Sequence, residues 1–488
     1  MNQVRNSILF SAADKYASQA LALVTTAVMA RILTPAETGL FVVANSVTLL
    51  ANNFRDFGVG TYIVQQKTVS REIVRSAFTL TLILSFAMAV AICLGSGTLA
   101  SFYHSQGLQN LLVVATLGFL MIPFSSPIMA LLQREMAFKA LAIINIGAAL
   151  AGCIVTVGLG LAGLGPVSYV WGSVVTGALI CVLALSARPE FWIFRPSLAG
   201  MRPLLSFGAV SSLITVSNMA YDLLPKFAFG KILGFDAVGL YARALTVCQL
   251  PDRFIVSALQ PVVLPAFAEQ ARSGDSLKAG YLHGLSLMTA VQWPVLIMLS
   301  LLAGPVVDIL LGPQWGAVPP LVRVMALANM ALAPAVLTFP VLVAAGRVGD
   351  ALWATLISLP PSFAIVIGAA FVNLEAVAAS LLVVAPLQMF VAYLFIRRAI
   401  GIGWADLVRA ARDSACLALG AALAPIVVVA TSSTGFSLGW LQTAMAVAGG
   451  AAGWAAALML VDHPLKKEIG GILLSVARRG WRSRAATP

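Results

Sequence analysis

Charged side chains are scarce in this chain of 488 residues. Asp, Glu, Lys and Arg together make up only 10% of it, apolar residues make up 60%, and the mean hydropathy is +0.96. Soluble domains ordinarily contain about 25% charged residues. The scarcity excludes an ordinary soluble domain and indicates a polytopic integral membrane protein.

Residues that support common catalytic or metal-binding chemistry are also sparse. The five cysteines form no C-x-x-C pair, and the three histidines, His104, His283 and His463, are scattered. No G-x-x-x-x-G-K-S/T phosphate loop occurs, which argues against direct ATP drive. We therefore expect no enzyme activity, no catalytic residues, no cofactor, no disulfide framework and no metal site.

Long stretches without a single charged residue predict where the chain crosses the membrane. One span needs about 20 apolar residues, so the longest stretches must each hold two, divided at turn residues such as Gly165 and Pro166. No period-2 alternation of apolar and polar residues indicates strands. The sequence predicts an all-α protein with fourteen transmembrane helices, at about 8–30, 36–60, 76–97, 108–132, 138–161, 165–186, 205–230, 237–264, 282–304, 319–344, 350–371, 375–396, 412–431 and 438–461.

Basic residues outside these spans fall almost entirely in alternate loops and at the two ends. The only basic residues in the opposite loops are Arg31 and Lys231. The positive-inside rule then places both termini in the cytoplasm, which agrees with an even number of spans. This topology and contact with anionic lipid account for the net charge of +12, so no nucleic-acid partner is expected.

One sequence element occurs twice, 200 residues apart. Residues 31–41 and 231–241 both contain a basic residue, Ile-Leu, five further residues, and then Gly-Leu followed by an aromatic residue. Each copy closes an odd-numbered span and opens the next, so the copies have the same membrane orientation, as in transporters built from parallel repeats. The repeat predicts two six-helix lobes related by a pseudo-two-fold axis, 1–200 and 201–400. Residues 401–488 then hold two further spans and a basic cytoplasmic tail.

Ionisable residues inside the predicted spans gather in spans 1, 2, 7 and 8, which the repeat places at the interface of the lobes. Each costs about 2.5–3.5 kcal/mol at the bilayer centre unless it faces a polar cavity or a partner. The four-residue spacing of Asn218, Asp222 and Lys226 puts them on one helical face. We expect a central transport cavity whose substrate-binding candidates are Asp14, Lys15, Arg55, Asp56, Asn218, Asp222, Lys226, Asp252 and Arg253.

Two interpretations of these charges stay open. In the first, the cationic side chains attract an anionic head group, arginine through bidentate phosphate contacts and lysine as a point charge. In the second, acids and bases neutralise each other, as Asp222 and Lys226 would at i,i+4 spacing. Asp14 or Asp222 is also a candidate carrier of a coupling proton.

The motif Arg31-Ile-Leu-Thr-Pro-Ala-Glu-Thr-Gly39-Leu-Phe41 and the opening from Asn6-Ser7 to Phe54-Arg55-Asp56-Phe57-Gly58 resemble the polysaccharide flippases of the MOP superfamily. The branch that carries exopolysaccharide and O-antigen repeat units, including the colanic-acid and succinoglycan transporters, is the most similar. Fourteen spans and a 6+6 repeat fit the same family. The resemblance covers essentially the whole chain.

The resemblance implies a V-shaped pair of lobes in a bacterial inner membrane. Such a protein flips an undecaprenyl-diphosphate-linked oligosaccharide to the periplasmic leaflet by alternating access, for exopolysaccharide or lipopolysaccharide biosynthesis. Its partners would be this substrate, membrane lipids, and a polysaccharide polymerase and chain-length regulator. Lys15, Arg55 and Lys226 are the head-group candidates that it implies.

Two other classes of membrane protein are alternatives to a flippase. A drug/cation antiporter of the same superfamily usually has twelve spans and cavity acids without accompanying bases, whereas acids and bases are balanced here. A polysaccharide polymerase or ligase is expected to have a sizeable external loop, and every predicted external loop is short.

Overall fold

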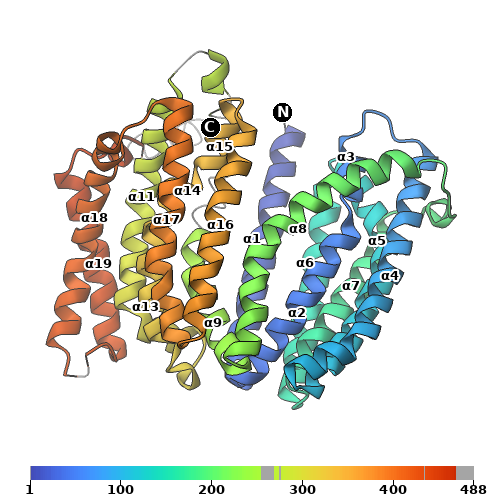
Figure 1. Cartoon of the computed structure of the whole chain (residues 1–488), viewed down its shortest axis with the longest axis horizontal. Coiled ribbons are helices and arrows are strands. Elements are labelled where there is room, and N and C mark those ends of the chain that lie inside the picture. The colour runs from blue at the N-terminus through green and yellow to red at the C-terminus, as the bar shows by residue number, and fades with distance from the viewer. Residues whose placement is uncertain (1, 254–266, 268, 274–275, 434, 469–488) are drawn as a thin grey trace, which may run out of the picture. The chain divides into compact units, whose positions relative to one another are not determined.

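Helices make up most of the part of the chain that the structure, a computed structural model, describes (Figure 1). The described residues are 2–253, 267, 269–273, 276–433 and 435–468. No strand occurs among them, which confirms the predicted all-α class. Contacts divide the chain into two units, Met1–Leu240 and Tyr241–Pro488. The predicted basic tail lies mostly outside the described residues.

The first unit is a bundle of long helices whose neighbours are mostly adjacent in sequence. α4 packs along α5, α6 packs along α7 and α1, and α8 packs against α2. Its core includes Ile63, Phe78, Ile128, Ile144 and Ile193, all buried. The helices are α1 (Asn2–Ile32), α2 (Pro35–Asp56), α3 (Val59–Gln65), α4 (Arg71–Tyr103), α5 (Gln106–Arg134), α6 (Phe138–Leu161), α7 (Val167–Ala187), η1 (Phe191–Phe194), α8 (Met201–Ile232) and the start of α9 (Phe235–Cys248).

The second unit holds the rest of α9 and the helices that follow it. α11 packs along α18, α18 along α19, and α16 along α17. One buried cluster, with Tyr281, Leu285, Tyr393 and Ile396, joins α11 to α17. The helices are α11 (Leu277–Leu301), α12 (Ala303–Leu310), η2 (Pro313–Trp315), α13 (Val318–Met330), α14 (Ala333–Val336), α15 (Thr338–Ala344), α16 (Val348–Ala370), α17 (Leu374–Ile400), α18 (Trp404–Thr431) and α19 (Trp440–Leu460).

Nine of the described helices are long and apolar enough to cross a membrane, and a pair bent by 61°, Val318–Met330 with Ala333–Ala344, makes a tenth if it is one broken span. A multi-pass membrane protein is thereby confirmed. α1, α2, α8 and α9 are not among these ten. They are the helices that correspond to the charged predicted spans 1, 2, 7 and 8, and the count of fourteen stays a prediction.

Two predicted spans are broken where the sequence suggested continuous helices. The span 36–60 ends early because Phe57 and Gly58 both adopt left-handed backbone, with φ of 46° and 64°, before α3 begins. The span 319–344 breaks after Met330. Pro334 lies in the first turn of α14, where its ring in a continuous helix would clash with the carbonyl four residues earlier.

The first copy of the repeated element folds as its residues dictate. The Glu37 amide donates to Thr34 Oγ1 (3.3 Å), and the Thr34 amide donates to Glu37 Oε2 (2.9 Å). This reciprocal capping box, with Pro35 at the first helical position, fixes the start of α2 after a two-residue turn.

Candidate functional site

A cavity of about 450 Å³ lies inside the first unit. Its volume falls within the range of about 300–1,000 Å³ that is usual for ligand pockets. α1, α2, α3, α5 and α6 all contribute side chains to it. The lining residues are Ser11, Asp14, Asp56, Gly60, Thr61, Ser126, Met129, Ala130, Gln133, Phe138, Leu141 and Asn145.

The carboxylate of Asp14 is held in place from two sides. Asn145 Nδ2, on α6, donates to Asp14 Oδ2 at 2.8 Å, and Ser18 Oγ, one turn along α1, donates to Oδ1 at 3.3 Å. The close packing of α1 along α6 brings Asp14 and Asn145 together. Hydrogen bonds to an ionised acceptor are stronger than neutral ones, so Asp14 presents a preoriented negative charge to the cavity.

The two residues of the predicted Arg55-Asp56 pair, both in the last turn of α2, have different surroundings. Asp56 is exposed and lines the cavity, whereas Arg55 is 8% exposed and is not among the lining residues. Arg55 Nε and Nη1 are buried and make no hydrogen bond to the described residues. The cavity therefore receives the acid of the pair, and of its described lining residues none is basic.

The other candidates of the predicted spans 1 and 7 either do not line the cavity or have side chains that the structure does not describe. Lys15 is exposed on α1 and Lys226 is half-buried on α8; neither lines the cavity. Asn218 and Asp222 lie on α8 as predicted, but their side chains lie outside the described residues. α8 is continuous from Met201 to Ile232, so the four-residue spacing does put all three on one helical face.

In the second unit, the predicted Asp252-Arg253 pair is also divided between different partners. Gln292 Nε2, on α11, donates to Asp252 Oδ1 at 2.7 Å. Arg253 is exposed, and its Nη2 reaches Gln249 Oε1 at 3.4 Å. Asp252 is thus tied to a neighbouring helix through a buried glutamine.

Two amide side chains of the cavity, Asn145 and Gln133, were not among the candidates predicted from sequence. Asn145 interrupts a run of apolar residues from 140 to 155, which was a usable signal. Gln133 lies beside Arg134 at the end of a predicted span, where a polar residue is unremarkable. It lines the cavity on α5, which packs against α3, and such tertiary packing is not visible in the sequence.

His463 also has a role that its isolated position in the sequence did not reveal. It is fully buried, with Nε2 at 3.0 Å from Ser286 Oγ and 3.1 Å from Ser414 Oγ. Its Nδ1 accepts from the Leu465 amide at 3.1 Å. Burial lowers the pKa of His463; nearby His283 adds to this effect and the charge of Asp413 opposes it. The imidazole ties the segment after α19 to α11 and α18.

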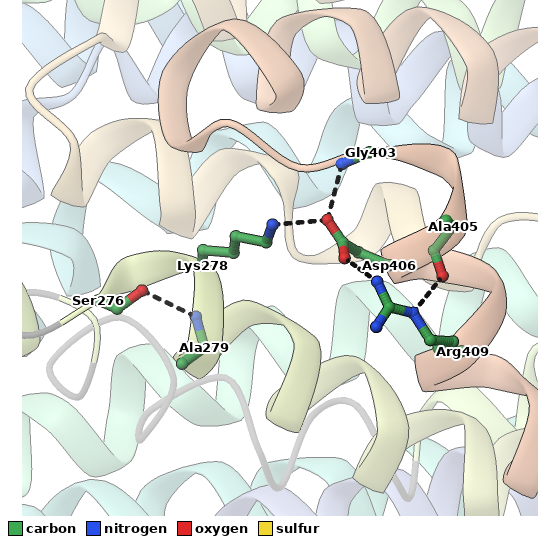
Figure 2. A network of polar contacts seen from close by, with 7 residues as sticks. All are labelled: Ser276, Lys278, Ala279, Gly403, Ala405, Asp406 and Arg409. Carbon is green, nitrogen blue, oxygen red and sulfur yellow. Dashed lines mark hydrogen bonds and ion pairs between the residues drawn. The ribbon is translucent and has the colours of Figure 1, made fainter.

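A polar network joins the starts of α11 and α18 (Figure 2). Lys278 Nζ lies 2.6 Å from Asp406 Oδ2, which also accepts from the Gly403 amide at 2.9 Å, and Arg409 Nη2 donates to Oδ1 at 2.8 Å. This network caps α18 and fixes the two helix starts side by side.

Among the described residues, no group of three or more His, Cys, Asp and Glu side chains could hold a metal ion. The cavity instead offers carboxylate, amide and hydroxyl groups beside apolar ones. Such groups can exchange hydrogen bonds with a hydroxyl-rich ligand, and the carboxylates can also bind a cationic one.

The chain matches proteins of polysaccharide assembly. A family described as polysaccharide biosynthesis protein covers residues 28–320. The lipopolysaccharide biosynthesis protein WzxC of Escherichia coli (strain K12) is 26% identical over 320 residues, 64% of this chain and 63% of WzxC. The succinoglycan biosynthesis transport protein ExoT of Rhizobium meliloti (strain 1021) is 25% identical over 360 residues, 72% of each chain. The match to WzxC thus spans slightly less than two thirds of that relative.

Solved structures of transporters share the fold. The lipid II flippase MurJ, in an inward closed conformation, has a TM-score of 0.71 at 12% identity over 92% of this chain and 98% of its own. An inward-facing multidrug resistance MATE transporter of the MOP superfamily has a TM-score of 0.54 at 16% identity, over 81% of this chain and 94% of its own. At these identities the likeness shows a shared fold, and the family match confirms the predicted relation to proteins of polysaccharide biosynthesis.

Proposed function

The chain belongs to the polysaccharide biosynthesis protein family, and we propose that it is a flippase for lipid-linked oligosaccharide. Its substrate is an undecaprenyl-diphosphate-linked repeat unit, carried across the bacterial inner membrane by alternating access. The observation that carries this proposal is the cavity around Asp14, a polar chamber of about 450 Å³ in a chain that is 60% apolar. Two relatives support the proposal by their names, a lipopolysaccharide biosynthesis protein and a succinoglycan biosynthesis transport protein.

The proposal includes the complete membrane topology. Adding the charged helices α1, α2, α8 and α9 to the ten membrane-capable ones accounts for all fourteen predicted spans. A charge is tolerated within a span when it faces a polar cavity, and Asp14 and Asp56 both line one. Both termini are then cytoplasmic, and the lobes 1–200 and 201–400 are related by a pseudo-two-fold axis.

We assign the cavity to the sugar and not to the diphosphate. Carboxylates of Asp14 and Asp56 accept hydrogen bonds from sugar hydroxyls, and the amides of Asn145 and Gln133 both donate and accept. Phe138 offers an apolar ring for the C–H face of a pyranose. A diphosphate beside two carboxylates would be repelled, so it meets cations outside this cavity. Of the three head-group candidates Lys15, Arg55 and Lys226, Lys15 is the exposed one.

The drug/cation antiporter remains a second candidate because of one specific observation. The cavity lining holds two acids and, among the described residues, no base, which is the arrangement expected for a cation site. The balance of acids and bases seen in the sequence therefore does not extend to this cavity. Asp14 is also the residue proposed to take a coupling proton or cation.

Deleting the gene separates the two functions. Loss of a flippase leaves undecaprenyl-diphosphate oligosaccharide on the cytoplasmic leaflet and stops polymer export, while sensitivity to cationic drugs stays unchanged. Loss of an antiporter leaves polymer output normal and raises drug sensitivity. Complementation with Asp14→Asn tests the cavity, and Glu269→Gln, which breaks only an exposed ion pair with Arg272, is the control.

A further inference from the structure

The two copies of the repeated element touch through their glycines. Gly39 and Gly239 are both buried and lie within the first unit. A Cβ on Gly39 would overlap the Phe235 carbonyl oxygen and lie 2.9 Å from the Gly239 amide nitrogen. A Cβ on Gly239 would overlap the Pro35 carbonyl oxygen and lie 3.1 Å from the Gly39 amide nitrogen. We call the contact of Pro35, Gly39, Phe235 and Gly239 the glycine seam.

Equivalent residues of the two copies of the repeated element make equivalent contacts in the seam. Gly39 meets residues 235 and 239, and Gly239 meets residues 35 and 39, each offset by 200. A contact that maps onto itself when two copies are exchanged is the signature of a two-fold axis that passes through it. The glycines of the motif are therefore used for backbone-to-backbone approach, for which no side chain leaves room.

The end of α4 packs beside the seam. Tyr103 Oη donates to the Phe227 carbonyl at 2.9 Å, and the rings of Tyr103 and Phe235 lie 5.9 Å apart. Lys231 Nζ donates to the Phe102 carbonyl at 2.6 Å. The seam and these contacts all lie at the helix ends that the charge pattern places outside the cytoplasm.

Resting on the proposed function, we propose that the glycine seam is the closed external gate of the transport cycle. The two copies of the motif must separate there before substrate can leave outward. A seam of backbone without interlocked side chains suits this role, because its weak Cα–H···O and van der Waals contacts part without rotamer changes. Rocking of one repeat against the other, as in other transporters built from repeats, opens it.

Labelling of a buried reporter tests the gate. Val238, next to Gly239 of the seam, is 0% exposed. Val238→Cys, in a chain whose five native cysteines are replaced, therefore reports opening to a membrane-impermeant maleimide added outside. Gly39→Ala and Gly239→Ala overpack the seam and should raise the labelling rate roughly tenfold, while export falls. Gly118→Ala in α5, where an added Cβ meets nothing within 4 Å, should change neither.

A second measurement serves if the alanine variants fail to reach the membrane. The Val238→Cys chain with an intact seam should label faster in cells that synthesise the lipid-linked oligosaccharide than in cells that do not. Equal labelling in both cells, or full export by the Gly39→Ala/Gly239→Ala double variant, overturns the gate. If instead the seam variants label faster but the gene deletion accumulates no lipid-linked oligosaccharide, the gate stands and the proposed function fails.

Discussion

Asp14 shows how one side chain acquires a role through its surroundings. The sequence placed it in an apolar span beside Lys15, and either residue could have faced a cavity. The structure gives Asp14 two hydrogen-bond donors and a place in the cavity wall, while Lys15 does not line it. A half-buried carboxylate fixed in this way is the group on which ligand binding in the cavity should depend most.

Asp14→Asn should reduce translocation at least roughly tenfold, because a hydrogen bond to a charged group contributes about 1.5–3 kcal/mol and the amide removes the charge while keeping the shape. Asn145→Ala should have a smaller effect, since Asp14 keeps its charge and the Ser18 bond. Export in a deletion strain measures both, with membrane abundance matched by immunoblot. Normal export by Asp14→Asn contradicts a role for this carboxylate.

His463 predicts a pH-dependent stability. The unfolded imidazole titrates near 6.5, and burial holds the pKa of the folded group below that value. Between the two values the unfolded chain binds more protons, so stability should fall as the pH drops below about 6.5 and be constant above it. The thermal midpoint in detergent measures this, and His463→Gln should lose the slope. His283→Gln should keep most of it; an unchanged slope in His463→Gln would refute the assignment.

Helices of this protein were largely predictable, because charge-free runs and turn residues mark where each one starts and ends. The breaks at Phe57 and after Met330 were not predictable. Left-handed backbone at a phenylalanine is unusual, and only tertiary packing selects it. The sequence also did not predict which member of the Arg55-Asp56 pair faces the cavity. Neighbours on a helix point about 100° apart, so Asp56 reaches the cavity and Arg55 is buried, which a linear pattern cannot distinguish.

Glycines also set how closely helices of the second unit approach. A Cβ on Gly420 of α18 would lie 2.7 Å from the Gly453 carbonyl oxygen of α19, and one on Gly453 would overlap the Gly420 carbonyl. Gly453→Ala should therefore destabilise the protein by about 1–3 kcal/mol through overpacking. The thermal midpoint in detergent measures it. Gly177→Ala, where nothing lies within 4 Å, should be neutral or slightly stabilising, and equal midpoints for both variants contradict this account.

At the scale of the whole molecule, the charge of the cavity predicts which sugars pass. Two carboxylates and no described basic residue in the lining favour neutral or amino sugars, because an acidic sugar would bring a like charge into a site partly shielded from water. Competition between repeat units with neutral and with uronic-acid residues measures the preference. Asp14→Asn/Asp56→Asn should move the rate ratio roughly tenfold toward the acidic substrate. If the rate ratio does not change, another part of the chain selects the sugar and this prediction is wrong.

The central claim is that this chain moves lipid-linked oligosaccharide through the cavity around Asp14. The most direct measurement uses purified protein in liposomes that carry labelled undecaprenyl-diphosphate oligosaccharide in one leaflet, with a glycosidase reporting its arrival in the other. We predict transfer with the unaltered chain and with Glu269→Gln, and a loss of at least roughly tenfold with Asp14→Asn. Transfer no faster than in protein-free liposomes, or equal rates for all three proteins, would contradict the claim.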